Sequence, residues 1–129
     1  MAGETEKITI NLGPIDLGQI DLLVQEGYYS NRTDLIRTAI RNQLTTHAEA
    51  VRQTVARKTL VLGLRQYTRQ DLEAVRVAGQ RLQISMLGLA TIADDVSPEL
   101  ALATIDSVSV LGAFHASDAV KRALAERIR

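Results

Sequence analysis

The sequence predicts an α+β protein made of two differently organised parts, and three observations predict it. Near the N-terminus, residues 7–12 alternate polar and apolar side chains, which is typical of a half-buried strand. Two segments with apolar residues at helical spacing follow directly. In the second half, three apolar runs end in glycines that lie 25 and 24 residues apart, and each run precedes a helix start.

Composition limits the function classes. The chain has 129 residues, of which 46% are hydrophobic and 3% aromatic, so we expect one domain or two small ones with an aliphatic core. The absence of cysteine excludes disulfides, a thiolate metal site and a cysteine nucleophile. No apolar run is long enough to span a membrane, and no signal-peptide pattern follows Met1, so a cytoplasmic location is expected.

The strand predicted at residues 7–12 needs a partner, because a lone strand leaves its backbone donors and acceptors unsatisfied. Its apolar face carries Ile8, Ile10 and Leu12, and its polar face carries Lys7, Thr9 and Asn11. Neighbouring segments offer no hairpin partner, so the simplest partner is the same strand of a second chain. The resulting two-stranded ribbon is narrow enough to enter the major groove of DNA.

Two helices are predicted after this strand. Pro14 suits the first turn of a helix, and Gly27 suits its end. Ser30 or Asn31 can cap the second helix, whose first turn carries Asp34. The apolar stripes consist of Leu17, Ile20, Leu23 and Val24 in the first helix and Leu35, Ile36, Ala39, Ile40 and Leu44 in the second.

This order of strand, helix, glycine turn and helix, with Ser30-Asn31-Arg32 opening the second helix, resembles the ribbon-helix-helix family of DNA-binding proteins over residues 6–46. The resemblance implies an intertwined dimer. It also implies that Lys7, Thr9 and Asn11 contact base edges, and that the start of the second helix holds a phosphate. The phosphate-contacting residues would be Ser30, Asn31, Arg32 and Thr33.

The side-chain chemistry of the ribbon agrees with base recognition. Lysine donates to guanine, asparagine both donates to and accepts from adenine, and threonine offers a hydroxyl or a methyl contact. The charge of this part does not favour a general attraction to the phosphates of DNA, because residues 1–50 hold four basic and seven acidic side chains. Residues 51–81 hold seven basic and two acidic ones, which either contact flanking phosphates or form a solvated surface.

Residues 47–58 are predicted to be a helical connector between residues 1–46 and residues 59–129. Neither glycine nor proline occurs from Thr33 to Lys58, and the apolar stripe of the second helix continues through Val51 and Val55. The second helix therefore either runs on or restarts after Thr45-Thr46.

The C-terminal part, residues 59–129, is predicted to be a small parallel β/α repeat of solenoid-like form, with a three-stranded α/β module as the competing fold. The apolar runs are residues 59–63, 84–88 and 108–112, and the helix starts are Thr68 with Asp71, Ser97-Pro98-Glu99 and Ser117-Asp118. Val75, Leu100 and Leu124 each follow their glycine by twelve residues. We expect the glycines to allow close backbone packing between strands. Neither end of the stack resembles a polar cap, so its edges are expected to pair with another copy.

No catalytic set is present, and neither a metal site nor a cofactor is expected, because His47 and His115 are far apart and no cysteine occurs. Asp94-Asp95 is best explained as a loop before a helix cap. We therefore expect a sequence-specific DNA-binding transcriptional regulator, most simply a repressor and not an enzyme, that binds double-stranded DNA as a homodimer. The C-terminal part would form tetramers or higher assemblies. The alternatives are an antitoxin or DNA partition factor, and a self-assembling scaffold anchored to DNA.

Overall fold

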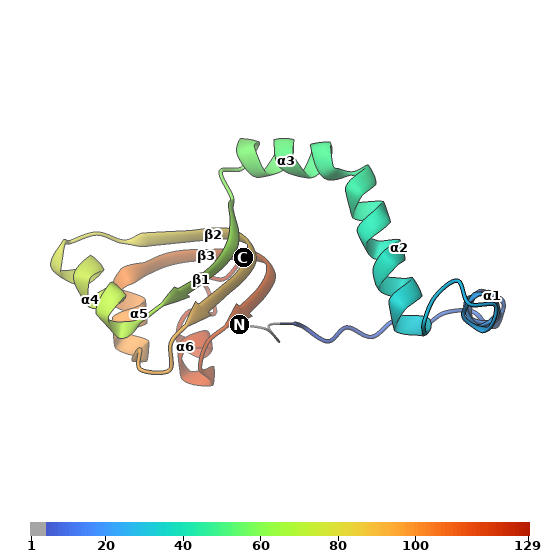
Figure 1. Ribbon diagram of the computed structural model, residues 1–129. Coiled ribbons are helices and arrows are strands. Elements are labelled where there is room, and N and C mark those ends of the chain that lie inside the picture. The colour runs from blue at the N-terminus through green and yellow to red at the C-terminus, as the bar shows by residue number, and fades with distance from the viewer. Residues whose placement is uncertain (1–4) are drawn as a thin grey trace. The chain divides into compact units, whose positions relative to one another are not determined.

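The computed structural model describes residues 5–129 and shows an α+β fold, as predicted (Figure 1). Residues 1–4 of the predicted 1–46 domain lie outside the described residues. The expectation that no signal peptide follows Met1 falls on the same residues. Contacts between Cα atoms divide the chain into two compact units, Met1–Gln53 and Thr54–Arg129. Within residues 5–129, no helix is long and apolar enough to cross a bilayer.

The first unit contains two helices that begin and end where the sequence signals lie. Helix α1 spans Pro14–Gln25 and starts on its proline. Gly27 follows with a φ of +85°, a left-handed conformation that glycine adopts without strain, and it turns the chain towards α2. Helix α2 spans Arg32–Thr46 and is capped by Asn31, one of the two predicted caps.

The segment at residues 7–12 has no strand assignment in the single chain that the structure describes. All six of its residues are exposed, including the apolar residues Ile8 and Ile10. A strand is defined by hydrogen bonds to a neighbour, so this segment requires a second chain to become one. The ribbon remains a prediction.

The connector begins as a new helix. Helix α3 spans Ala48–Arg57 and is separated from α2 by His47. The hydroxyl groups of Thr45 and Thr46 donate to the carbonyl oxygens of Arg41 and Asn42, at 2.9 and 3.1 Å. Such bonds compete with the regular helix and bend it, which explains why α2 stops here.

The second unit is a parallel three-stranded sheet whose strand order, β1-β2-β3, follows the chain. Its strands are β1 (Val61–Tyr67), β2 (Leu82–Ile92) and β3 (Ile105–His115). The intervening and final helices are α4 (Arg69–Val77), α5 (Pro98–Thr104) and α6 (Asp118–Ala123). The three helices lie on the same side of the sheet, and the strands curve around them (Figure 1). Parallel strands with helical crossovers were predicted and are confirmed.

The strands extend further than the apolar runs suggest, and the first begins later. Residues 84–88 and 108–112 lie inside strands of eleven residues each. Thr59, placed in a strand by the sequence, instead has a φ of +54° and belongs to the turn that closes α3. The amide of Leu60 donates to the carbonyl of Val55 at 2.9 Å, so the helix end takes up these residues before β1 starts.

The three repeat glycines form one row across the sheet, because Gly63 pairs with Gly88 and Gly88 pairs with Gly112. Their φ angles are +139°, +138° and +122°, which side chains rarely allow. A Cβ atom on Gly88 would lie 2.1 Å from the carbonyl oxygen of Gly63, and one on Gly112 would lie 2.2 Å from that of Gly88. Close backbone packing is therefore confirmed at Gly88 and Gly112, whereas a Cβ atom on Gly63 meets nothing within 4 Å.

Each predicted helix start of the repeat is capped. Thr68 and Asp71 form a reciprocal capping box at α4. Ser97 accepts a hydrogen bond from the amide of Leu100, and Ser117 accepts one from the amide of Val120. Asp95 accepts a hydrogen bond from the amide of Arg69 at 3.2 Å, so this loop carboxylate also serves the start of α4.

The aliphatic core lies between the sheet and its helices. Buried positions of β2 alternate, as expected for a strand with one face towards helices. Of the three apolar residues that follow their glycine by twelve positions, Leu100 and Leu124 are buried. The third, Val75, is half-buried, and Leu72 fills the core from α4 instead. The core side chains are Tyr67, Leu72, Ile84, Met86, Ala90, Ile92, Val96, Leu100, Ala101, Ile105, Val108, Val120 and Leu124.

Candidate nucleic-acid interface

The predicted base-contacting residues, Lys7, Thr9 and Asn11, lie in the exposed segment before α1. Between them, the side chains of Ile8, Ile10 and Leu12 are 74%, 58% and 42% exposed. Strict alternation places the two groups on opposite faces of the segment once it is extended as a strand. A second strand beside it would give a polar face for bases and an apolar face for the helices.

Neither α1 nor α2 contains a fully buried side chain. Among residues 5–53, no side chain is buried to the degree of a core residue. Leu23 of the α1 stripe and Leu44 of the α2 stripe are 37% and 59% exposed. An apolar stripe on each helix without a core to contact it is unfavourable in water, which favours burial against a second copy.

The N-terminus of α2 holds the predicted phosphate-contacting residues together. The Asn31 side-chain oxygen accepts from the amide of Asp34 at 2.8 Å, and the Asp34 carboxylate accepts from the amide of Ser30 at 2.9 Å. Arg32 and Thr33 are the first two helical residues, whose amides have no acceptor one turn back in the helix. Two amides therefore point out of the helix end, where its dipole favours an anion.

Asp21 was not foreseen as part of this surface. Its carboxylate accepts two hydrogen bonds from the Arg32 guanidinium, at 2.7 Å from Nε and 2.8 Å from Nη2. The pair joins α1 to the start of α2 and orients Arg32. No sequence signal marks it, because the two residues are eleven apart and lie on different helices.

This ion pair shifts the pKa values of both side chains. The hydrogen bonds from Arg32 lower the pKa of Asp21 below its usual 3.8, and the charge of Arg32 adds to that effect. The same contact raises the pKa of Arg32. Arg32 stays charged and Asp21 stays ionised near neutral pH, so the pair itself adds no net charge to the helix end.

Most basic side chains of residues 51–81 contact acidic or aromatic side chains of the same chain. Arg52 pairs with Glu49 and Arg76 with Glu73, each within its own helix. The Nε atom of Arg81 lies 3.4 Å from Oδ1 of Asp106, and the guanidinium of Arg65 lies 4.9 Å from the ring centre of Tyr67. Four of the seven cations are thus occupied, which favours a solvated surface over a general phosphate contact.

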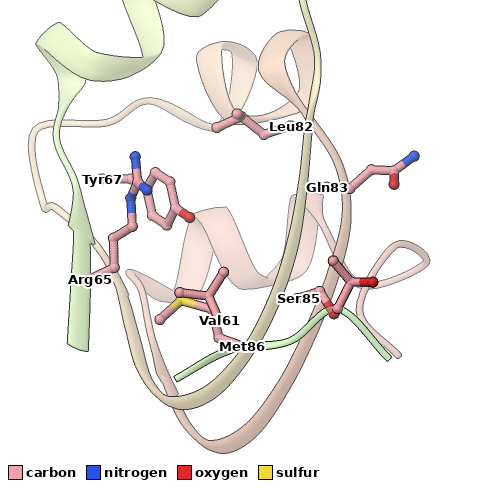
Figure 2. Close-up of a pocket in the computed structure, with 8 residues that line it drawn as sticks. Val61, Arg65, Tyr67, Leu82, Gln83, Ser85 and Met86 are labelled. Carbon is pink, nitrogen blue, oxygen red and sulfur yellow. The ribbon is translucent and has the colours of Figure 1, made fainter. Parts of the chain in front are cut away.

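A hollow of about 210 Å³ lies in the second unit beside the starts of β1 and β2 (Figure 2). Figure 2 shows Arg65 next to the ring of Tyr67 and Gln83 turned away. Burial raises the pKa of Tyr67, partly offset by the charge of Arg65, so the ring stays a neutral phenol. The hollow is smaller than most ligand pockets, which span roughly 300–1,000 Å³. Within residues 5–129, no cluster of three metal-ligating side chains occurs either.

Comparison with known proteins assigns the chain to a family. The model of the ribbon-helix-helix transcriptional regulator family matches residues 3–121. An uncharacterized protein of the archaeon Methanocaldococcus jannaschii is 42% identical over 40 residues, which is 31% of this chain and 41% of that relative. The match thus spans less than half of that relative's length. No solved structure matches the chain. Since the family model covers both units, the chain belongs to the ribbon-helix-helix transcriptional regulator family, whose members bind DNA as dimers.

Proposed function

We propose that the protein is a sequence-specific transcriptional repressor that reads the major groove with a ribbon formed by two copies. Residues 1–46 form the DNA-binding part, residues 47–58 the connector and residues 59–129 the assembly part. Lys7, Thr9 and Asn11 contact base edges. Ser30, Asn31, Arg32 and Thr33 hold the DNA backbone, with the amides of Arg32 and Thr33 as the donors.

The observation that carries this proposal is the exposed apolar face of the first unit. The alternating side chains Ile8, Ile10 and Leu12 and the stripes of α1 and α2 have no core in the single chain. Pairing of two copies buries all of them at once and leaves the polar face of the ribbon outside. That face is uncommitted to any core, which is what base recognition requires.

Specificity in this proposal comes from placed contacts more than from general attraction. The first fifty residues carry more acid than base, so nonspecific attraction to phosphate is weak. Linking dimers through the C-terminal part raises the effective concentration of each ribbon at adjacent half-sites. Modest affinity for one half-site then suffices, and a repressor acting on DNA in this way works in the cytoplasm.

The test is selection of bound sequences from a random DNA pool with the full chain, at two salt concentrations. A short motif enriched in inverted or tandem pairs supports the proposal, and sedimentation on DNA carrying two motifs then reports assembly above the dimer. Binding without enrichment contradicts it and favours the scaffold alternative, in which DNA is only an anchor. A partition factor differs by enriching long arrays of the motif, whereas an antitoxin typically has a disordered tail in place of the folded second unit.

A further inference from the structure

Strand β1 forms one edge of the sheet, and its outer side pairs with no strand within residues 5–129. It is also the most exposed apolar strand of the second unit. The side chains of Val61, Leu62 and Leu64 are 54%, 69% and 66% exposed. The strand contains no lysine or proline and carries a single charge, Arg65, which already stacks on Tyr67.

The opposite edge is partly covered, contrary to the expectation that both ends of the stack are uncapped. The amide of Val108 donates to the carbonyl of Arg127 at 2.9 Å, and the amide of Arg129 donates to the carbonyl of Val108 at 2.8 Å. The bridge between Val108 and Ile128 thus covers part of the outer side of β3. The guanidinium of Arg127 also donates to the carbonyl oxygens of Leu102 and Ile105.

An edge without such protection is a template for another strand, because its backbone groups remain unpaired on one side. There is room for a neighbouring backbone beside β1. An ideal Cβ atom on Gly63 meets nothing within 4 Å, whereas the same atom on Gly88 or Gly112 runs into the preceding strand. The exposed leucines of β1 continue across the helix-free face, where Leu62 pairs with Leu87 and Leu87 with Leu111.

We propose that β1 pairs with β1 of a second copy, antiparallel about a two-fold axis, so that one sheet runs through the C-terminal units of both chains. Identical edges meet in this arrangement, as an isologous contact requires. Because the family binds DNA as dimers, a second β1 is tethered near every first one, at an effective concentration of roughly millimolar. This pairing joins the second units of one dimer, so it goes beyond the linking of dimers proposed above, and it does not depend on base recognition by the ribbon.

The sequence of β1 fits a two-fold axis at its middle residue, Leu64. In that register Leu64 faces its own counterpart, and each Arg65 faces the Gly63 position of the other chain. Glycine leaves space for the guanidinium, so the single charge of the strand meets no side chain. Leu62 then lies opposite Gln66, so no two like charges lie directly opposite each other, and the two Arg65 side chains are diagonal neighbours across the axis.

Site-directed cross-linking tests the pairing directly, since the chain contains no cysteine to interfere. Side chains directly opposite in antiparallel strands have Cβ atoms roughly 4.5–5.5 Å apart, close to disulfide geometry. Mild oxidation of Leu64→Cys, or of Leu62→Cys if the axis lies there, is expected to give covalent pairs on a non-reducing denaturing gel. Val77→Cys, 86% exposed at the end of α4, is the matched control. Cross-linking of both β1 variants no greater than that of the control overturns the proposal.

Charge complementation separates a failure of pairing from a failure of folding. Leu64→Lys and Leu64→Glu are each expected to lose the protection against hydrogen exchange of the β1 amides that face away from β2, while β2 stays protected. Mixing the two variants is expected to restore protection, because opposite charges then meet across the seam. Unchanged exchange in both single variants, with Val77→Lys as control, contradicts the pairing. Enrichment of the DNA motif by Leu64→Lys is measured in parallel, so failure of base recognition and failure of β1 pairing are seen separately.

Discussion

The Arg32 guanidinium binds both oxygens of the Asp21 carboxylate, at 2.7 and 2.8 Å, and so ties α1 to the N-terminus of α2. Bidentate geometry of this kind fixes the plane of the arginine. The side chain is therefore oriented beside the two helix amides that we propose for phosphate binding. The pair lies at the surface, so its contribution to stability is small and depends on salt.

Replacing Asp21 with asparagine is expected to remove a stabilising contribution that is present at neutral pH and lost in acid. The pKa of Asp21 in the folded chain lies below its ordinary 3.8, so the pair stabilises the fold above that pH. The stabilisation disappears as pH falls through the folded pKa. Urea unfolding of the parent and of Asp21→Asn should therefore differ most near neutral pH and converge in acid, whereas a constant difference would exclude the ion pair as the cause.

The same substitution is expected to strengthen DNA binding and steepen its salt dependence. Asp21→Asn frees the Arg32 guanidinium and removes a negative charge beside the proposed phosphate site. One added phosphate contact raises the slope of log affinity against log salt by about 0.9. Asp16→Asn, in the first turn of α1, makes the same change in net charge and is the control. Equal slopes for the two variants would place the Arg32 guanidinium away from the DNA backbone.

Thr9→Ala and Asn11→Ala are each expected to relax base preference by about 1–3 kcal/mol without affecting dimer formation, because each removes a side chain that we propose to bind a base edge. Both side chains lie on the polar face of the segment, away from the apolar residues. Affinities for the selected motif and for single-base variants of it measure the effect. Thr45→Ala, exposed in the last turn of α2, is the matched control. An unchanged preference in both ribbon variants would remove the ribbon as the base-contacting element.

Ile10→Asp is expected to abolish dimerisation through the first unit, because a carboxylate would enter the proposed dimer core. Ile10 is 58% exposed in the single chain, so a monomeric unit would tolerate this change. Sedimentation of Ile10→Asp and of Thr9→Asp, its neighbour on the opposite face, each combined with Leu64→Lys to remove β1 pairing, distinguishes the two cases. Loss of association in both variants, or in neither, contradicts the alternation that defines the ribbon.

Local signals predicted most of the fold. Pro14 and Gly27 bound the first helix, Asn31, Thr68, Ser97 and Ser117 cap the later ones, and the glycine spacing gives the strand register. Each of these depends on residues within a few positions of one another, or on a repeat. For the same reason, Thr59 was misplaced: nothing in its neighbours distinguishes a strand start from the left-handed end of α3.

Contacts between distant residues were not predictable. The pair of Asp21 and Arg32 depends on how two helices cross, and the cover of β3 by Ile128 comes from a tail with no strand pattern. Of the candidate site, the sequence identifies the polar face of Lys7, Thr9 and Asn11 and the start of α2. The strand itself depends on a second chain, so no single-chain signal or structure completes it.

Gly88→Ala is expected to destabilise the second unit more than Gly63→Ala, although both glycines have nearly the same φ. Alanine at either position incurs the strain of a positive φ, about 1–3 kcal/mol. At Gly88 the new Cβ would also lie 2.1 Å from the Gly63 carbonyl oxygen, whereas at Gly63 it meets nothing within 4 Å. Denaturant unfolding followed by a probe in the second unit measures the difference, and Gly112→Ala should behave like Gly88→Ala. Equal destabilisation at all three positions would mean that strain alone, and not close strand packing, requires glycine in this row.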